Sequence, residues 1–267
     1  MDRMSRMVAK TARMATGPMR YLEAGAGRPM VLLHAFPLGA EQWLPQLARP
    51  PIGWRLIAPD LRGFGGSPWM GDVASASIDR YAADVFELMT HLDVPRASVA
   101  GLSMGGYVAL AMMARDAERI TGLVLADTRA TADSPEARAA RDRMIELVRR
   151  EGSPGVAREM VGKLLGESTR TQQPDLVDAV VALVEANGPE GVEAAIRAMR
   201  DRPDRTELLA AIDCPTVVMC GGQDVVTPPE ECEAMSRQIR GAQFVRLDGA
   251  GHLANLERPI EFTAALA

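Results

Sequence analysis

The sequence predicts an α/β fold, with a mostly parallel sheet, helices on both faces of the sheet and an inserted helical cap. Short apolar runs alternate with helical stretches, which is the pattern of βαβ units. A loop rich in polar residues or glycine follows most of the apolar runs. From Thr128 to Asp213 only helical segments are indicated, without a convincing strand. A chain of 267 residues can bury one large core and carry such an insertion.

Composition excludes several classes of protein. The chain is 47% hydrophobic and 24% charged, as in ordinary globular enzymes, and its net charge of −5 provides no basic surface for nucleic acid. No apolar run reaches the roughly 18 residues of a membrane-spanning helix, and residues 1–20 lack the apolar core of a secretory signal. The 3 cysteines are an odd number, which argues against a disulfide framework. We therefore expect a cytoplasmic protein without stable membrane association, whose oligomeric state the sequence leaves open.

The strands are predicted from short apolar, β-prone runs. We expect the first dozen residues to be a loose arm and residues 19–23 to form an edge strand. Buried strands follow at residues 30–33, 55–59, 97–100, 120–126, 215–220 and 242–247.

The helices are predicted from apolar residues spaced by three and four. They cover residues 80–91, 107–114, 137–150, 175–186 and 191–199, and Ser77 or Asp79 is the expected N-cap of the first. We place the cap at residues 128–205 and the core domain at residues 1–127 and 206–267. The cap helices are expected to pack on the core, with a membrane-facing lid as the alternative.

Residues 99–106 form the most informative stretch, because they read as a strand, a sharp turn and the start of a helix. Ser103 stands at the apex of that turn. Gly101 and Gly105 are expected where side chains would collide between the closely packed strand and helix. The turn would expose the Ser103 hydroxyl at a helix N-terminus, where it becomes a nucleophile only if a base and oxyanion donors reach it.

The chain has 3 histidines from which to choose that base. His91 lies near a helix C-terminus, where a partly exposed imidazole is expected for structural reasons. His34 follows an early strand, whereas His252 lies in a glycine-rich loop after the last one. Ser103, Asp224 and His252 occur in the order nucleophile, acid, base. In this arrangement His252 accepts the serine proton and Asp224 holds the imidazole tautomer.

Other charged residues have competing interpretations. Asp127 also follows a strand and is the rival acid, but we expect it to cap the helix or turn that enters the insertion. Asp60 and Arg62 are expected to form an ion pair that braces their own loop.

The backbone N–H groups of Phe36 and Met104 are the expected oxyanion donors. The substrate pocket is predicted to be largely apolar, with His34, Trp43 and Arg129 as candidate lining residues. Arg129 could attract a substrate carboxylate, and the alternative is a solvated or salt-bridged arginine.

These motifs together resemble the α/β-hydrolase fold superfamily, in particular its cap-bearing branch of esterases, enol-lactonases, haloperoxidase-like enzymes and C–C bond hydrolases. The resemblance runs from about Met19 onward and rests on residues 33–37, 60–67, 101–106, 221–224 and 251–252. It implies the same roles for the five site residues named above as nucleophile, acid, base and oxyanion donors. Ala35 departs from the pattern, because similar enzymes usually have glycine after the histidine, and we expect it to narrow the oxyanion loop slightly.

The expected function is hydrolysis of carboxylic esters with small or medium acyl groups, through an acyl-serine intermediate. Serine at the turn argues against haloalkane dehalogenase and epoxide hydrolase chemistry, for which the resemblance implies aspartate. An enol-lactonase of the 3-oxoadipate type is one alternative, and a ligand-binding receptor on a hydrolase fold is another. We expect a small-molecule ester or lactone substrate and no cofactor, since no histidine pair has zinc-ligand spacing and no phosphate-binding loop is present.

Overall fold

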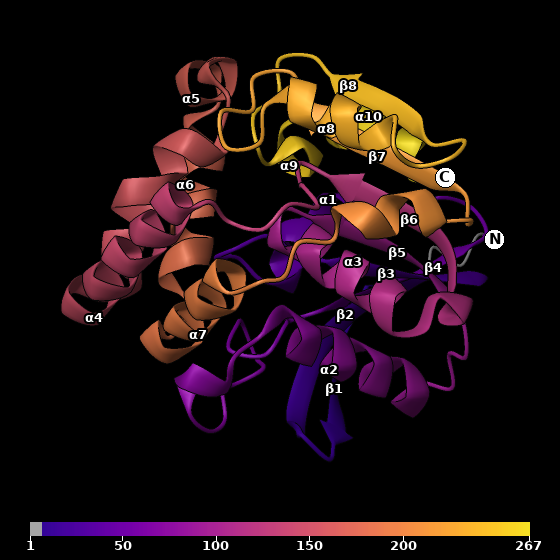
Figure 1. Ribbon diagram of the computed structural model, residues 1–267, viewed down its shortest axis with the longest axis horizontal. Coiled ribbons are helices and arrows are strands. Elements are labelled where there is room, and N and C mark those ends of the chain that lie inside the picture. The colour runs from indigo at the N-terminus through magenta and orange to yellow at the C-terminus, as the bar shows by residue number, and fades with distance from the viewer. Residues whose placement is uncertain (1–6) are drawn as a thin grey trace.

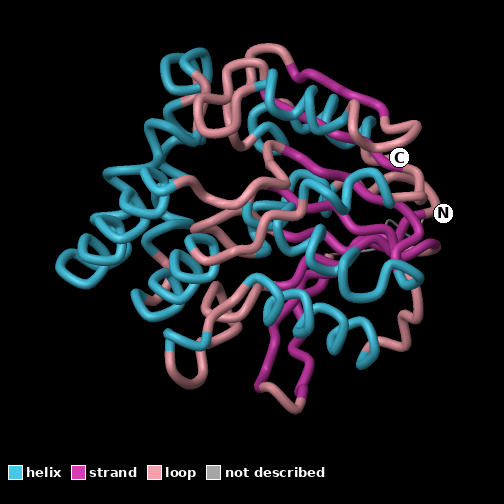
Figure 2. Tube along the Cα trace, viewed as in Figure 1, coloured by secondary structure: helices cyan, strands magenta, loops and turns pink. Residues whose placement is uncertain are grey.

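The computed structural model describes residues 7–267 and contains one eight-stranded sheet. The strand order is β1-β2-β4-β3-β5-β6-β7-β8, and the strands from β4 to β8 in this order pair in parallel. Their bounds are β1 Val8–Met14, β2 Gly17–Gly25, β3 Arg28–Leu33, β4 Trp54–Pro59, β5 Ala97–Leu102, β6 Ile120–Ala126, β7 Thr216–Gly221 and β8 Gln243–Leu247. Figure 2 shows this sheet between helices on both sides. The predicted fold class is therefore confirmed.

The N-terminal end of the sheet differs from the prediction. β1 pairs antiparallel with β2 along its length, from Val8 opposite Glu23 to Met14 opposite Gly17. Residues 8–12 are therefore part of the sheet and not a loose arm, whereas residues 1–6 of the expected arm lie outside the described residues. β2 is also not an edge strand, because β4 pairs with its other side. The ladder forms because β1 leads through a tight turn at Gly17, whose φ is 117°, directly into β2.

Helices cover both faces of the sheet. α2 (Ile78–His91) and α3 (Met104–Asp116) pack together on one face, and α8 (Pro229–Ser236) packs against β7 and β8. α1 (Leu44–Ala48), α9 (Ala254–Glu257) and α10 (Pro259–Ala265) form a second group on the other side of the sheet (Figure 1). Of the two predicted N-caps, Ser77 is the one that caps α2, because its hydroxyl accepts a hydrogen bond from Arg80 N–H.

The central strands are buried on both faces, which explains their almost continuous apolar sequence. In β3 and β5, Leu32, Leu33 and Val99 are completely buried. Burying each such side chain contributes about 1.5–3 kcal/mol. In register, Leu33 lies opposite Gly101 and Leu102 opposite Ala126, so these strands end at one edge of the sheet.

A helical segment separates β6 from β7. It contains α4 (Pro135–Leu164), α5 (Glu167–Gln172), α6 (Pro174–Glu185) and α7 (Pro189–Arg200), gathered beyond the carboxyl ends of the parallel strands (Figure 1). α4 is longer than predicted, but it is interrupted at Gly152, whose φ of 64° is not helical. Among the described residues, no helix combines the length and apolar character needed to cross a membrane.

Candidate active site

Ser103 occupies the turn between β5 and α3. Its φ of 53° and ψ of −113° are strained for a residue with a side chain, at a cost of about 1–3 kcal/mol. A Cβ on Gly101 would lie 2.2 Å from the Gly105 carbonyl oxygen, and a Cβ on Gly105 would lie 2.1 Å from that of Leu33. Only glycine fits at these two positions, for the reason predicted from the sequence.

Neighbouring backbone holds the strained turn in place. Ser103 N–H donates to the Ala126 carbonyl at 2.9 Å, which joins the turn to the end of β6. The Thr128 hydroxyl donates to the Ser103 carbonyl at 2.8 Å. Sequence reasoning did not identify Thr128, whose role depends on the close approach of two chain segments.

The structure brings the side chains of Ser103, His252 and Asp224 together from three separate loops. His252 Nε2 lies 2.8 Å from Ser103 Oγ, and His252 Nδ1 lies 2.7 Å from Asp224 Oδ2. Asp224 Oδ1 accepts hydrogen bonds from Val226 N–H at 2.7 Å and Thr227 N–H at 3.0 Å, which fixes the carboxylate. With the proton on Nδ1, Nε2 presents its lone pair to the serine hydroxyl. This arrangement is suited to nucleophilic catalysis by an activated serine.

Asp127 lies close to this group but makes different contacts. Its Oδ1 accepts from Gly221 N–H at 2.7 Å, whereas its Oδ2 has no hydrogen-bond partner among the described residues. The expected capping role is wrong, because Ser134 caps α4 and Asp127 instead joins β6 to the end of β7. Burial raises the pKa of Asp127 well above its usual range, and the negative charge of Asp224 raises it further. Both effects favour the neutral carboxylic acid form of Asp127.

One atom each from Asp127, Asp224 and His252 lie within 4.8 Å of one another, close enough for three ligands of a metal ion. Two of these residues are already engaged, because His252 Nδ1 is hydrogen-bonded to Asp224 Oδ2 and Nε2 faces the serine. The same hydrogen bonds suit proton transfer from Ser103 to His252, which needs no metal ion.

The expected oxyanion donors lie on two segments beside Ser103. Met104 is the first residue of α3, where backbone N–H groups lack partners inside the helix. Phe36 lies in the loop after β3, and its ring packs edge-on against Phe64 at 6.4 Å. Within residues 7–267, neither the Phe36 nor the Met104 N–H donates to a protein acceptor. Ala35 N–H, by contrast, donates to Gln42 Oε1 at 2.8 Å.

His34 is completely buried, and both of its ring nitrogens have partners. Nε2 accepts from Leu61 N–H at 3.0 Å, so Nδ1 carries the proton and donates to the Ala35 carbonyl at 2.9 Å. Burial lowers the pKa of His34 and keeps its ring neutral. The contacts of His34 therefore join the loops that follow β3 and β4.

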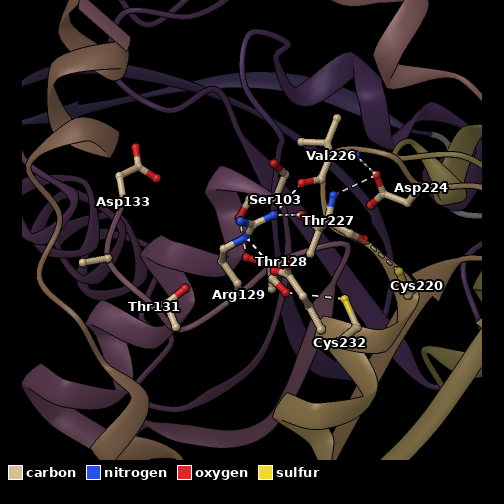
Figure 3. Close-up of polar contacts among 12 residues, drawn as sticks. Ser103, Thr128, Arg129, Thr131, Asp133, Cys220, Asp224, Val226, Thr227 and Cys232 are labelled. Carbon is tan, nitrogen blue, oxygen red and sulfur yellow. Dashed lines mark hydrogen bonds and ion pairs between the residues drawn. The ribbon is translucent and has the colours of Figure 1, made fainter. Parts of the chain in front are cut away.

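The other two candidate pocket residues also make contacts within the protein. Trp43 is completely buried and packs against Phe262 at 5.8 Å between ring centroids. The guanidinium of Arg129 points toward the loop that follows Asp224 (Figure 3). There Arg129 Nη2 donates to the Val226 carbonyl at 2.5 Å, and its Nε lies 3.3 Å from Glu231 Oε2.

The ion pair expected between Asp60 and Arg62 is wrong. Asp60 pairs with Arg20 of β2 at 2.7 Å, while Arg62 reaches α2 and pairs with Asp84 at 2.7 Å. The loop that carries Asp60 and Arg62 lies between β2 and α2, so each side chain meets an element that is distant in the sequence. The short spacing of the two residues does not reveal these partners.

A buried amide network beside the site was also missed. Gln42 Nε2 donates to Asn255 Oδ1 at 3.2 Å, and Asn255 Nδ2 donates to the Gln42 carbonyl at 2.9 Å. Gln46 Nε2 donates to the Asn255 carbonyl at 3.1 Å. The network connects the loop of Phe36 with α9, which follows His252. The only signal in the sequence was the spacing of Gln42 and Gln46, which lie four residues apart.

Comparison with known proteins gives a consistent assignment. Residues 28–259 match the family model described as the alpha/beta hydrolase fold. The chain is similar to the structure of a thermophilic esterase from Thermogutta terrifontis, with 41% identity, a TM-score of 0.90 and coverage of 98% of this chain and 97% of the esterase. It is also similar to the enol-lactonase from Burkholderia xenovorans LB400, with 26% identity, a TM-score of 0.88 and coverage of 96% and 98%. Among curated proteins, the pimeloyl-[acyl-carrier protein] methyl ester esterase of Neisseria meningitidis is 29% identical, with coverage of 90% and 91%. On these grounds the chain belongs to the alpha/beta hydrolase fold family.

Proposed function

We propose that this protein is a carboxylic ester hydrolase that uses Ser103 as nucleophile, His252 as base and Asp224 as the orienting acid. The observation that carries the proposal is the continuous line of contacts from Ser103 Oγ to His252 at 2.8 Å and from His252 to Asp224 at 2.7 Å. A lone serine hydroxyl is a weak nucleophile, and such a line supplies the base and the tautomer that it needs.

The reaction proceeds in two stages. Ser103 Oγ attacks the ester carbonyl carbon while His252 Nε2 takes the serine proton, and the Phe36 and Met104 N–H groups stabilise the oxyanion. The carbon–oxygen bond to the alcohol then breaks, and His252 returns the proton to the leaving oxygen. Water repeats the sequence on the acyl-serine, which releases the carboxylic acid and restores Ser103. Asp224 takes up no proton in either stage and stabilises the imidazolium.

We propose small or medium acyl groups as substrates, with residues 128–205 acting as a cap that covers the site and shapes the acyl pocket. The esterases among the similar proteins support ester hydrolysis. The similar enol-lactonase favours lactones as a second candidate, because a lactone is an internal ester that the same residues could open.

The described cysteines are free thiols, which supports a reducing compartment such as the cytoplasm.

The test compares the wild type with Ser103→Ala on a panel of p-nitrophenyl esters and lactones. We expect the wild type to turn over at least one of these classes and to be labelled by a small fluorophosphonate. Ser103→Ala should fold normally, lose labelling and lose turnover by at least about a thousandfold. A folded Ser103→Ala protein with full activity would refute the nucleophile assignment. A wild type that binds these compounds without turnover would favour the receptor alternative.

A further inference from the structure

Glu257 is a buried carboxylate near the proposed base. It is the last residue of α9, and only 3% of its surface is exposed. Its Oε1 accepts a hydrogen bond from Gly251 N–H at 2.8 Å, and its Oε2 accepts one from Gly166 N–H at 2.9 Å. Gly251 directly precedes His252, whereas Gly166 lies between α4 and α5. One carboxylate therefore connects the His252 loop to the helical segment.

Further contacts join the same two segments. Leu253 N–H, on the other side of His252, donates to the Leu164 carbonyl at 3.1 Å. The Ser168 hydroxyl donates to the Gly249 carbonyl at 2.8 Å. The backbones are so close that a Cβ on Gly251 would lie 2.3 Å from Gly166 N. The loop that carries His252 is thus held against residues 164–168 both before and after the histidine.

The two contacts of Glu257 require a carboxylate in particular. Removing a carboxylate from water is unfavourable, so a buried one is retained where it accepts strong hydrogen bonds. Hydrogen bonds to a charged group are stronger than those between neutral groups. Glutamine has a single acceptor oxygen, and its NH2 group would face one of the two N–H donors. The isosteric amide would therefore lose one of the two connections.

We propose that Glu257 is a positioning residue for ester hydrolysis, and that it holds His252 at the correct distance from Ser103 by tying Gly251 to Gly166. The inference rests on the proposed function, since it assigns Glu257 a role through the base. Misplacing a catalytic group by about 1 Å can reduce the rate about a hundredfold. Because Glu257 acts on the base and not on the substrate, its loss should lower kcat and leave KM nearly unchanged.

The first test is Glu257→Gln, assayed with p-nitrophenyl acetate and with a small fluorophosphonate. We expect kcat and the rate of Ser103 labelling to fall together by about tenfold to a hundredfold, with KM changed less than twofold. Glu261→Gln is the matched control, because Glu261 is an exposed acid in the next helix, α10. If a folded Glu257→Gln protein has the kcat and labelling rate of this control, the inference is wrong.

A second test keeps Glu257 in place and covers the case in which Glu257→Gln does not fold. Ser168→Ala removes only the hydroxyl contact between α5 and Gly249, and we expect about a threefold lower kcat with unchanged KM. Thr171→Ala is its control, because within residues 7–267 the Thr171 hydroxyl donates only to carbonyls of its own helix. Equal kcat values for Ser168→Ala and Thr171→Ala would contradict the inference that contacts with residues 164–168 position His252. The proposed function fails separately, if the wild type shows neither turnover nor labelling of Ser103.

Discussion

At the residue scale, two buried aspartates lie side by side but have different contacts. Asp224 accepts hydrogen bonds from Val226 N–H, Thr227 N–H and His252. Asp127 accepts one from Gly221 N–H, and its other oxygen has no partner in the part of the chain that the structure describes. Hydrogen bonds from N–H groups stabilise a carboxylate, and Asp127 accepts fewer of them than Asp224. Burial and the neighbouring Asp224 charge raise the pKa of Asp127, which favours its protonated form.

Because the two aspartates differ in this way, replacing each with asparagine should have different effects on kcat. Asp224→Asn should lower kcat by about 10³–10⁴-fold, because the amide cannot maintain the imidazole tautomer or stabilise its cation. Asp127→Asn replaces a neutral acid with an amide of the same shape, and its kcat should stay within about threefold of wild type. Steady-state kinetics on a p-nitrophenyl ester, with melting temperature as the control for folding, would compare them. A larger loss of kcat in Asp127→Asn, with unchanged melting, would make Asp127 the acid.

At the scale of elements, one arginine joins the two ends of the helical segment between β6 and β7. Arg202 is only 5% exposed and follows α7. Its Nη2 donates to the Thr131 carbonyl at 2.9 Å, and its Nη1 lies 2.6 Å from Asp133 Oδ1. Its guanidinium also stacks 4.1 Å from the centroid of the Tyr107 ring in α3. The chain entering and the chain leaving the segment are thus fastened to each other and to the core.

Replacing Arg202 should therefore destabilise the protein strongly. Arg202→Met keeps much of the aliphatic volume but removes the buried partner of Asp133, which retains the partly exposed Arg141 at 3.1 Å. The loss should therefore approach about 3–5 kcal/mol, which is typical of a broken buried pair. The free energy of unfolding from urea denaturation would measure this. Arg138→Met is the control, because Arg138 pairs with Asp201 where both side chains are about half exposed, and such pairs contribute about 1 kcal/mol or less. Similar losses in both variants would show that Arg202 does not fasten the segment.

At the scale of the whole molecule, buried titratable groups make stability depend on pH. The pKa of Asp127 is raised in the folded state, so the folded protein keeps a proton that the unfolded chain loses above about pH 4. The stabilising contribution is complete at low pH and is lost as pH rises toward the folded pKa. His34 has the opposite effect, because its pKa is lowered by burial and its contribution is lost as pH falls below about 6.5.

The pH-dependent contribution of Asp127 can be isolated from the difference in unfolding free energy between Asp127→Asn and wild type, because the contribution of His34 is the same in both proteins and cancels. We expect this difference to change in favour of the variant by up to about 1.4 kcal/mol per pH unit as the pH rises from about 4 toward the raised pKa of folded Asp127. Urea denaturation at several pH values would measure it. The exposed Asp175 supplies the control Asp175→Asn, whose difference from wild type should stay constant over the same range. A constant difference for Asp127→Asn would mean that Asp127 is ionised in the folded protein.

Local patterns in the sequence were sufficient for the fold class and for the three residues proposed as nucleophile, base and acid. The apolar runs predicted the buried strands because a strand covered on both faces needs apolar residues along its whole length. The turn at Ser103 was predictable because Gly101 and Gly105 are required by sterics within a few residues. Chain order then selected Asp224 and His252, whose polar atoms lie within hydrogen-bonding distance in the structure.

Contacts between distant segments were decided only by the tertiary structure. Asp60 pairs with Arg20 instead of Arg62, and Asp127 contacts β7 instead of capping a helix. Glu257 has no distinguishing local pattern, and its two partners are backbone groups 6 and 91 residues away. A charged side chain takes whichever donors the packed chain brings near it, and many partners are equally compatible with the same local sequence. Only the packing of the sheet and its helices selects among them, because burial makes an unpaired charge too costly.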